Sequence, residues 1–230
     1  MYPAMFDPTY MMLVIPAILL ALYAQMRLKS TFARYSAIHA SRGVSADYVS
    51  RMLLDSYGLG NVRIERVPGS LTDHYDPRSK TLRLSDSVGG SSSIAAIGVA
   101  AHEVGHAIQD KEGYAPLRFR NAFVPVASIG SNSAFMFFFI GLMMRASVLM
   151  NIGILLFLCA VVFQFVTLPV EFDASNRALR VLASTGTLSQ SEIAGAKSVL
   201  SAAALTYVAA TLMAVMQLLY LIMRSRGRRN

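Results

Sequence analysis

The fold of this chain is decided by FVPVASIGSNSAFMFFFIGLMM at residues 123–144 and VLMNIGILLFLCAVVFQFVTL at residues 148–168. Each run is close to the roughly 20 apolar residues that an α-helix needs to cross the hydrocarbon core of a bilayer. Only Arg145, Ala146 and Ser147 separate the two runs. We therefore expect a tight hairpin of two transmembrane helices.

Two further apolar runs lie near the ends of the chain, at about Tyr10–Met26 and about Ala202–Met223. The first has no basic segment before it and no small-residue cleavage site after it, so we expect a retained anchor. The composition agrees, because 54% of the 230 residues are hydrophobic and 15% are charged, whereas soluble domains have about 25% charged residues. The sequence predicts a mainly α-helical integral membrane protein with about four transmembrane helices.

The formal net charge of +8 is concentrated beside the apolar runs, as in Arg27–Lys29 and Arg224–Arg229. Basic residues in these positions are typical of contact with anionic lipid headgroups and of topology control. No nucleic-acid recognition motif accompanies the charge, so membrane lipids are expected partners and nucleic acid is not. Cys159 is the only cysteine, which excludes an intrachain disulfide and a zinc site built from cysteines.

The polar segment at residues 27–121 is long enough for a small folded domain of α+β type. Its apolar residues recur at helical spacing in two places and alternate with polar residues in two others. The expected elements are a helix from Ser45 or Asp47 to Gly58 or Gly60, a strand at 62–67, a strand at Thr81–Leu84, and a helix that starts after Ser91–Ser93 and ends near Gly113.

Residues 102–106 read His-Glu-Val-Gly-His and fall within the second of these helices. Positions i and i+4 of a helix share one face, so His102 and His106 can bind one zinc ion. Glu103 is placed to take a proton from a zinc-activated water and pass it to a leaving amine. The pattern predicts a zinc peptidase site, and the alternative is a helix with two histidines that bind no metal.

A catalytic zinc site has three protein ligands and one open position, so a third ligand is required. Glu171 directly follows the third apolar run, and the hairpin returns the chain to the membrane face that carries the histidines. A carboxylate at that depth is costly unless it has a partner, and a metal ion is one such partner. Glu171 is the expected third ligand. Asp173 is the competitor, and a plain helix end at the interface is the alternative role for Glu171.

The chain resembles the YugP-like family of neutral zinc metallopeptidases of bacterial membranes. The resemblance rests on LTDHYDP at residues 71–77, Leu84-Ser85, SIAAIGVAAHEVGHAIQ at residues 93–109, and the order of the membrane segments. It covers nearly the whole chain. More remotely, the chain is similar to HtpX-like and CAAX prenyl membrane proteases, which place a membrane hairpin between the two histidines and a glutamate in a Glu-Phe-x-Ala-Asp motif.

This resemblance places the glutamate ligand at Glu171, within the sequence EFDAS at residues 171–175. Ser175 stands where the remote relatives have an aspartate that orients a zinc-bound histidine. Support of that kind fixes the tautomer and the orientation of the imidazole ring. We therefore expect the support to come from Ser175, Asp173 or Asn176, or from another element.

Two residues are candidates for contact with a substrate. Arg177 can stabilise an oxyanion, or pair with Asp173 or a lipid phosphate, and His74 can line the cleft or lie in a turn. In such proteases a strand edge beside the zinc helix commonly aligns a peptide through main-chain hydrogen bonds. Residues Thr81–Ser85 are the expected edge.

The resulting domain plan has five parts: a transmembrane anchor at 1–26, an α+β catalytic domain at 27–121, a transmembrane hairpin at 122–170, a third-ligand helix and connector at 171–201, and a transmembrane helix with a basic tail at 202–230. The resemblance implies a zincin-like, gluzincin-type catalytic domain. The basic residues after the first run favour a cytoplasmic catalytic domain, whereas the tail at Arg224–Arg229 opposes it. The resemblance to HtpX-like proteases favours the cytoplasmic side of a bacterial cell membrane.

The expected function is that of a membrane-embedded zinc metalloendopeptidase with peptide or protein substrates, and the resemblance associates it with membrane-protein quality control. The alternative is a non-catalytic membrane scaffold or chaperone-like partner with a structural zinc, which would use a fourth protein ligand and need no base. A transporter is not expected, because the apolar runs are nearly free of ionisable residues. The sequence leaves open a membrane-protein partner or a homo-oligomer.

Overall fold

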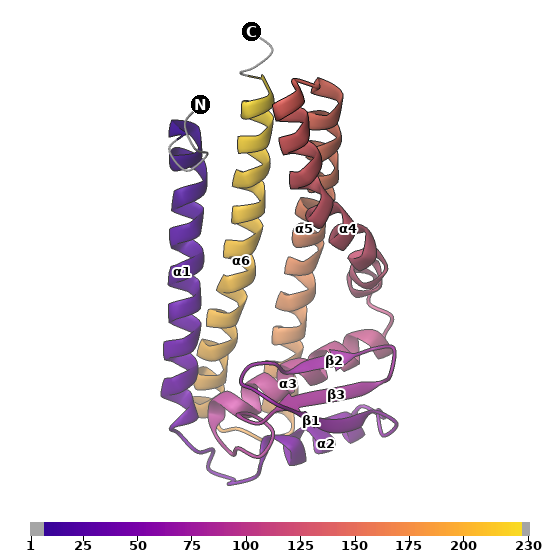
Figure 1. The fold of residues 1–230 in the computed structure, drawn as a ribbon. Coiled ribbons are helices and arrows are strands. Elements are labelled where there is room, and N and C mark those ends of the chain that lie inside the picture. The colour runs from indigo at the N-terminus through magenta and orange to yellow at the C-terminus, as the bar shows by residue number, and fades with distance from the viewer. Residues whose placement is uncertain (1–6, 227–230) are drawn as a thin grey trace. The chain divides into compact units, whose positions relative to one another are not determined.

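The computed structural model describes residues 7–226, which fold into two compact units. Of the described residues, the first unit contains 7–25, 119–168 and 205–226, and the second contains 26–118 and 169–204. The chain forms helices α1 (Pro8–Ser36), α2 (Ala46–Ser56), α3 (Ile94–Lys111), α4 (Ala115–Met144), α5 (Ser147–Ser184) and α6 (Gln190–Arg226), and strands β1 (Arg63–Val67), β2 (His74–Asp76) and β3 (Thr81–Ser85) (Figure 1).

The helices α1, α4, α5 and α6 are long and apolar enough to cross a membrane. They contain the four apolar runs of the sequence, so the prediction of a mainly helical protein with four candidate membrane helices and a small sheet is confirmed. The helices extend beyond the apolar runs, and α5 continues past Leu168 to Ser184. Of the predicted basic tail, residues 227–229 lie outside the described part of the chain.

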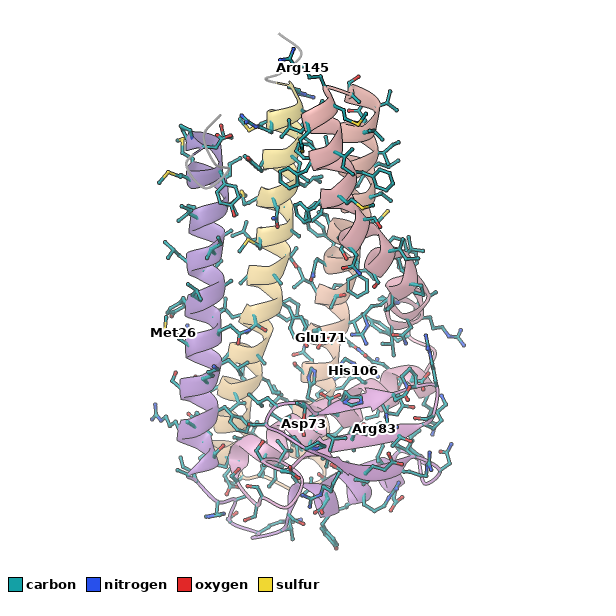
Figure 2. The ribbon with its side chains drawn as sticks, in the orientation of Figure 1. Met26, Asp73, Arg83, His106, Arg145 and Glu171 are labelled. Carbon is teal, nitrogen blue, oxygen red and sulfur yellow. The ribbon has the colours of Figure 1, made fainter. Side chains whose placement is uncertain are left out.

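In the first unit, glycines allow α4 and α5 to pack closely. A Cβ atom added to Gly130 would lie 2.7 Å from the carbonyl oxygen of Leu156, and one added to Gly153 would lie 2.7 Å from that of Ala134. These distances leave no room for a side chain, which is typical of helices that pack in membranes. The turn between the helices is made at Arg145, where φ is 56° (Figure 2). The predicted hairpin of two apolar helices is therefore present.

The second unit contains a three-stranded sheet in the order β1-β3-β2. Strand β3 pairs in parallel with β1 and antiparallel with β2, and the register places Ile64, Leu82 and Tyr75 side by side. Leu82 is fully buried on this face. Arg83 projects from the opposite, polar face, where its Nε lies 3.2 Å from a carboxylate oxygen of Glu65. The alternation of apolar and polar residues predicted both β1 and β3.

Helix α3 lies in the core of the second unit. The main-chain N–H of Ala96 donates to Oγ of Ser93 at 3.2 Å, so the cap predicted from the serine run is present. The helix contacts α2, β2 and β3, and Ile97, Val104 and Ile108 are almost completely buried. Burial of one such side chain contributes about 1.5–3 kcal/mol relative to exposure. Packing therefore fixes the position of the helix that carries the two histidines.

The prediction that Thr81–Ser85 forms the exposed edge of the sheet was wrong. These residues form β3, which has a paired strand on each side. The edge beside α3 is β2, a three-residue strand that begins at His74, a residue that the sequence placed either in the cleft or in a turn. Alternation identifies a strand but does not tell a central strand from an edge strand, and β2 is too short to show any periodicity.

Candidate functional site

The three predicted metal ligands meet within the second unit. The imidazole rings of His102 and His106 lie one turn apart on α3, with centroids 4.8 Å apart. Their Nε2 atoms lie 3.2 Å and 3.5 Å, respectively, from Oε2 of Glu171 on α5 (Figure 2). Glu171 belongs to the part of α5 that lies in the same compact unit as α3. Glu171 is 4% exposed, and burial of its carboxylate is costly unless cationic or hydrogen-bonding groups compensate the charge.

A glycine between the two histidines permits this convergence. A Cβ atom on Gly105 would lie 2.5 Å from the carbonyl oxygen of Ala174. A side chain at this position would therefore collide with the backbone of α5. The close approach of the two helices brings the face of α3 that carries both histidines against Glu171.

Glu103 directly follows His102 on α3 and is also buried. Its Oε2 accepts a hydrogen bond of 3.0 Å from the main-chain N–H of Tyr75, on the outer side of β2. Burial is the main cause that raises the pKa of Glu103 to about 7. The positive charge of His102 opposes the rise, and the negative charges of Glu171 and Asp73 add to it. Glu103 is therefore a carboxyl group able to exchange a proton near neutral pH.

Polar side chains hold β2 in place beside Glu103. The Tyr75 hydroxyl donates to Oδ2 of Asp110 on α3 at 2.7 Å, and Nζ of Lys80 lies 2.5 Å from the same oxygen. Before the strand, the carboxylate of Asp73 accepts hydrogen bonds from the main-chain N–H and the hydroxyl of Ser85, at 2.7 and 2.9 Å. The position of the Tyr75 N–H is thus set by contacts to both α3 and β3.

The Nδ1 atom of each histidine has a protein partner. Nδ1 of His102 lies 3.1 Å from Oγ of Ser175, and Nδ1 of His106 lies 3.0 Å from Oε1 of Gln109. Asp173 is linked to His106 through Gln109, because Oδ2 of Asp173 accepts a hydrogen bond of 2.8 Å from Nε2 of Gln109. Of the three residues expected to support the histidines, the structure places Ser175 next to one ring and links Asp173 indirectly to the other.

Arg177 is engaged in ion pairs with two carboxylates. Its Nε lies 2.5 Å from Asp173, its Nη1 lies 2.5 Å from Glu112, and its guanidinium lies over the ring of Tyr114 at 5.8 Å. The pairing with Asp173 is one of the alternatives that the sequence left open. These contacts hold the guanidinium beside Asp173 and Glu112.

The structure does not bring His74 or Asn176 to the three ligands. A ring nitrogen of His74 donates to the main-chain oxygen of Thr72 at 2.9 Å, and the residue is exposed. His74 pairs in register with Arg83, so it lies on the polar face of the sheet, opposite to the face of Tyr75. Asn176 is exposed, and its carbonyl oxygen accepts a hydrogen bond of 3.4 Å from Arg180.

Residues 10–226 match the model of a family described as "Putative neutral zinc metallopeptidase". This chain belongs to that family. A curated relative, "Putative membrane protease YugP" of Bacillus subtilis (strain 168), is 45% identical over 214 residues, which cover 93% of this chain and 95% of the relative. No solved structure matches this chain. As a member of the zinc metallopeptidase family with four apolar helices, the chain is a multi-pass membrane protein, and the predicted resemblance to the YugP-like family is confirmed.

Zinc is the cofactor that the family implies, and the site fits it. One donor atom from each of His102, His106 and Glu171 lies within 4.8 Å of the other two. Tetrahedral zinc with bonds of about 2.0–2.1 Å separates its ligand atoms by roughly 3.3 Å. The distances of 3.2 and 3.5 Å from Glu171 to the two imidazoles agree with that value. Two imidazoles and one carboxylate are also a donor set found in catalytic zinc sites.

Sequence reasoning missed two residues of this candidate site. Gln109 lies three positions after His106, a spacing that places both on one side of a helix, and it is a polar residue on an otherwise apolar segment. That spacing could have identified it. Tyr75 acts on Glu103 through its main-chain N–H, and such a contact leaves no trace in the type of residue.

Proposed function

We propose that this protein is a membrane-embedded zinc metalloendopeptidase in which His102, His106 and Glu171 hold the metal and Glu103 is the general base. The observation that carries the proposal is the convergence of three donor atoms from α3 and α5. They lie next to Glu103, a buried carboxyl group on the helix that carries both histidines. The second unit is then a small zincin-like catalytic domain. It is of the gluzincin type, because the third ligand is a glutamate from a later helix.

The proposed hydrolysis assigns a distinct task to each group. Zinc, when bound, polarises a carbonyl oxygen and lowers the pKa of a coordinated water to about 7. Glu103 takes the proton from the attacking water and returns it to the leaving amine. In the chain without zinc, burial raises the pKa of Glu103 to about 7, so burial opposes the lowering of this pKa by a bound cation. The N–H of Tyr75 keeps the accepting carboxylate in position.

A peptide substrate is proposed to align along the outer edge of β2. The N–H of Tyr75 points away from β3 and reaches Glu103, so this edge passes next to the proposed base. Addition of an extended peptide to such an edge uses main-chain hydrogen bonds. Since the N–H of Tyr75 is bonded to Glu103, the peptide would donate to the carbonyl oxygen of Tyr75, which points to the same side of the strand as the N–H. Strand β2 thus takes the role that the sequence assigned to Thr81–Ser85.

The proposed catalytic domain combines residues 27–121 with the ligand helix at 171–201, which corresponds closely to the second compact unit at 26–118 and 169–204. We propose that it faces the cytoplasm, because basic residues such as Arg27 and Lys29 follow the first apolar run. A role in membrane-protein quality control remains part of the proposal through the resemblance to HtpX-like proteases.

The test compares wild-type protein, purified in detergent, with Glu103→Ala and Glu171→Ala. Zinc content and cleavage of casein, an unfolded substrate, are measured in parallel. Glu103→Ala is expected to keep about one zinc per chain and lose cleavage, whereas Glu171→Ala is expected to lose zinc. If Glu171→Ala retains zinc, Asp173 becomes the candidate ligand.

Two results would contradict the proposed enzymatic function. If the wild-type protein binds zinc but cleaves no unfolded protein, the scaffold or chaperone-like function is favoured. If it binds no metal after removal and restoration of zinc, the metallopeptidase assignment of this chain fails.

A further inference from the structure

The ring of His106 is held by a fully buried amide. Gln109 is 0% exposed, and its Oε1 lies 3.0 Å from Nδ1 of His106. Both residues are on α3, one turn apart, so the contact exists without help from any other element. The Nε2 atom on the opposite side of the ring faces Glu171.

The surroundings of Gln109 determine which end of its amide faces the histidine. Its Nε2 lies 2.9 Å from the carbonyl oxygen of Val170 and 2.8 Å from Oδ2 of Asp173. A carbonyl oxygen and an ionised carboxylate only accept hydrogen bonds, so the NH₂ group must face these two atoms. Oε1 is then the atom that faces His106.

Asp173 forms an ion pair with a cation. Nε of Arg177 lies 2.5 Å from Oδ2 of Asp173, and the same guanidinium binds Glu112. An arginine remains protonated at all ordinary pH values. The ion pair holds the Asp173 carboxylate against the amide of Gln109, which donates to it, and so keeps the amide in one orientation.

An amide oxygen only accepts, so Nδ1 of His106 must carry the proton. Nε2 is then the nitrogen left to bind a metal ion, and in the metal-free chain it faces the Glu171 carboxylate, to which it can donate a second proton. His102 is held differently, because its Nδ1 lies 3.1 Å from the hydroxyl of Ser175. A hydroxyl can donate or accept, so Ser175 is compatible with either tautomer of His102.

We propose that Gln109 is the positioning residue that fixes His106 in the tautomer with the proton on Nδ1, and that Asp173 and Arg177 hold its amide for this task. The proposal rests on the proposed zinc site. It gives Arg177 a role in orienting a ligand instead of stabilising an oxyanion. It also gives the two histidines unequal support, since one is fixed by an amide and the other by a hydroxyl.

The first test is metal affinity, measured on the full-length protein in detergent by competition with a chromogenic zinc chelator. Gln109→Met keeps the length of the side chain and removes the acceptor. We expect Gln109→Met to weaken zinc binding about 10- to 100-fold, the usual cost of losing such a partner. Ser175→Ala is expected to lose less than Gln109→Met.

The second test reads the tautomer directly in the metal-free protein, at an alkaline pH where the imidazole ring carries a single proton. Nitrogen NMR of ¹⁵N-histidine-labelled protein distinguishes protonation at Nδ1 from protonation at Nε2. The wild type is expected to show a histidine held with the proton on Nδ1, which His106→Asn removes from the spectrum and Gln109→Met converts to an exchanging mixture. Melting curves of the variants identify any that fail to fold.

The outcomes separate the two proposals. Equal zinc affinity of wild type and Gln109→Met would overturn the role of Gln109. A loss of affinity in Gln109→Met with the tautomer of His106 unchanged would overturn it too, because the residue would then only pack α3 against α5. If wild-type protein binds zinc no better than a His102→Ala, His106→Ala double variant, the proposed zinc site itself fails. The tautomer measurement still tests the contact to Gln109 in that case.

Discussion

The α-carbon of Gly105 lies so close to α5 that a Cβ atom there would be 2.5 Å from the carbonyl oxygen of Ala174. Two helix backbones therefore touch between the two histidines. An alanine would favour the helix by about 1 kcal/mol through its intrinsic propensity. Overpacking against a backbone atom typically costs 1–3 kcal/mol, so the steric effect is expected to outweigh the propensity.

Gly105→Ala is accordingly expected to lower the melting temperature and to weaken zinc binding, because α3 and α5 must move apart. Thermal unfolding and zinc content measure the two effects. Gly60→Ala is the matched control, since its Cβ would meet only the Asp55 carboxylate at an ordinary 3.7 Å. Zinc affinity equal to that of wild type in Gly105→Ala would show that the helix contact does not set the ligand spacing.

Glu103→Gln is expected to lower the rate of casein cleavage by about 10²- to 10⁴-fold, the usual contribution of a general base. The amide keeps the shape of the side chain and can still accept the hydrogen bond from Tyr75, but it cannot take a proton. Zinc content should not change. Glu65→Gln, on the polar face of the sheet, is the control and should retain activity. Residual activity near that of wild type in Glu103→Gln would move the role of base to another group.

The raised pKa of Glu103 makes the stability of the metal-free protein depend on pH. Its carboxyl group titrates at about 7 in the folded chain and near 4.3 when unfolded. The folded state binds more protons between these values, so this contribution is present below pH of about 4.3 and is lost as the pH rises through 7. Wild type should therefore lose stability relative to Glu103→Gln over this range in melting curves at a series of pH values. Parallel curves for the two proteins would contradict the shift.

Tyr75→Phe tests how firmly β2 is attached to α3. It removes the 2.7 Å hydrogen bond to Asp110, and bonds to charged groups contribute about 1.5–3 kcal/mol. Lys80 still pairs with Asp110, so we expect a loss near the lower end of this range by chemical denaturation. The main-chain bond to Glu103 remains, and kcat/KM should fall less than 10-fold. Tyr48→Phe, at an exposed tyrosine, should change neither quantity.

The membrane helices and the two histidines could be predicted because their signals are local. Apolar runs of membrane-spanning length and a spacing of four residues on a helix are visible in any single stretch of sequence. Glu171 was within reach because a hairpin was expected to return the chain to the side it left. The full length of α5 was not, since Pro169 lies inside this helix and a proline usually marks a helix boundary.

The order of the strands and the partners of Arg177 depend on contacts between distant segments. Thr81–Ser85 alternates like an edge strand and proved to be central, because the short strand at His74–Asp76 covers its other side. The sequence left Asp173, a lipid phosphate and an oxyanion as possible partners of Arg177, and only the folded structure shows that Asp173 and Glu112 pair with it. Gln109 lies in the sequence stretch quoted for the family resemblance. Its proposed role in positioning His106, however, depends on the burial of its amide, which the sequence does not show.

The brevity of β2 has a consequence for selectivity. A strand of three residues turns one main-chain position, Tyr75, towards its free side. Such a short edge can bind an extended backbone but can hardly discriminate between the side chains along it. A protease that uses it would choose its targets by how often they lose their own structure, so local unfolding of the target would set the rate of cleavage more than any consensus sequence.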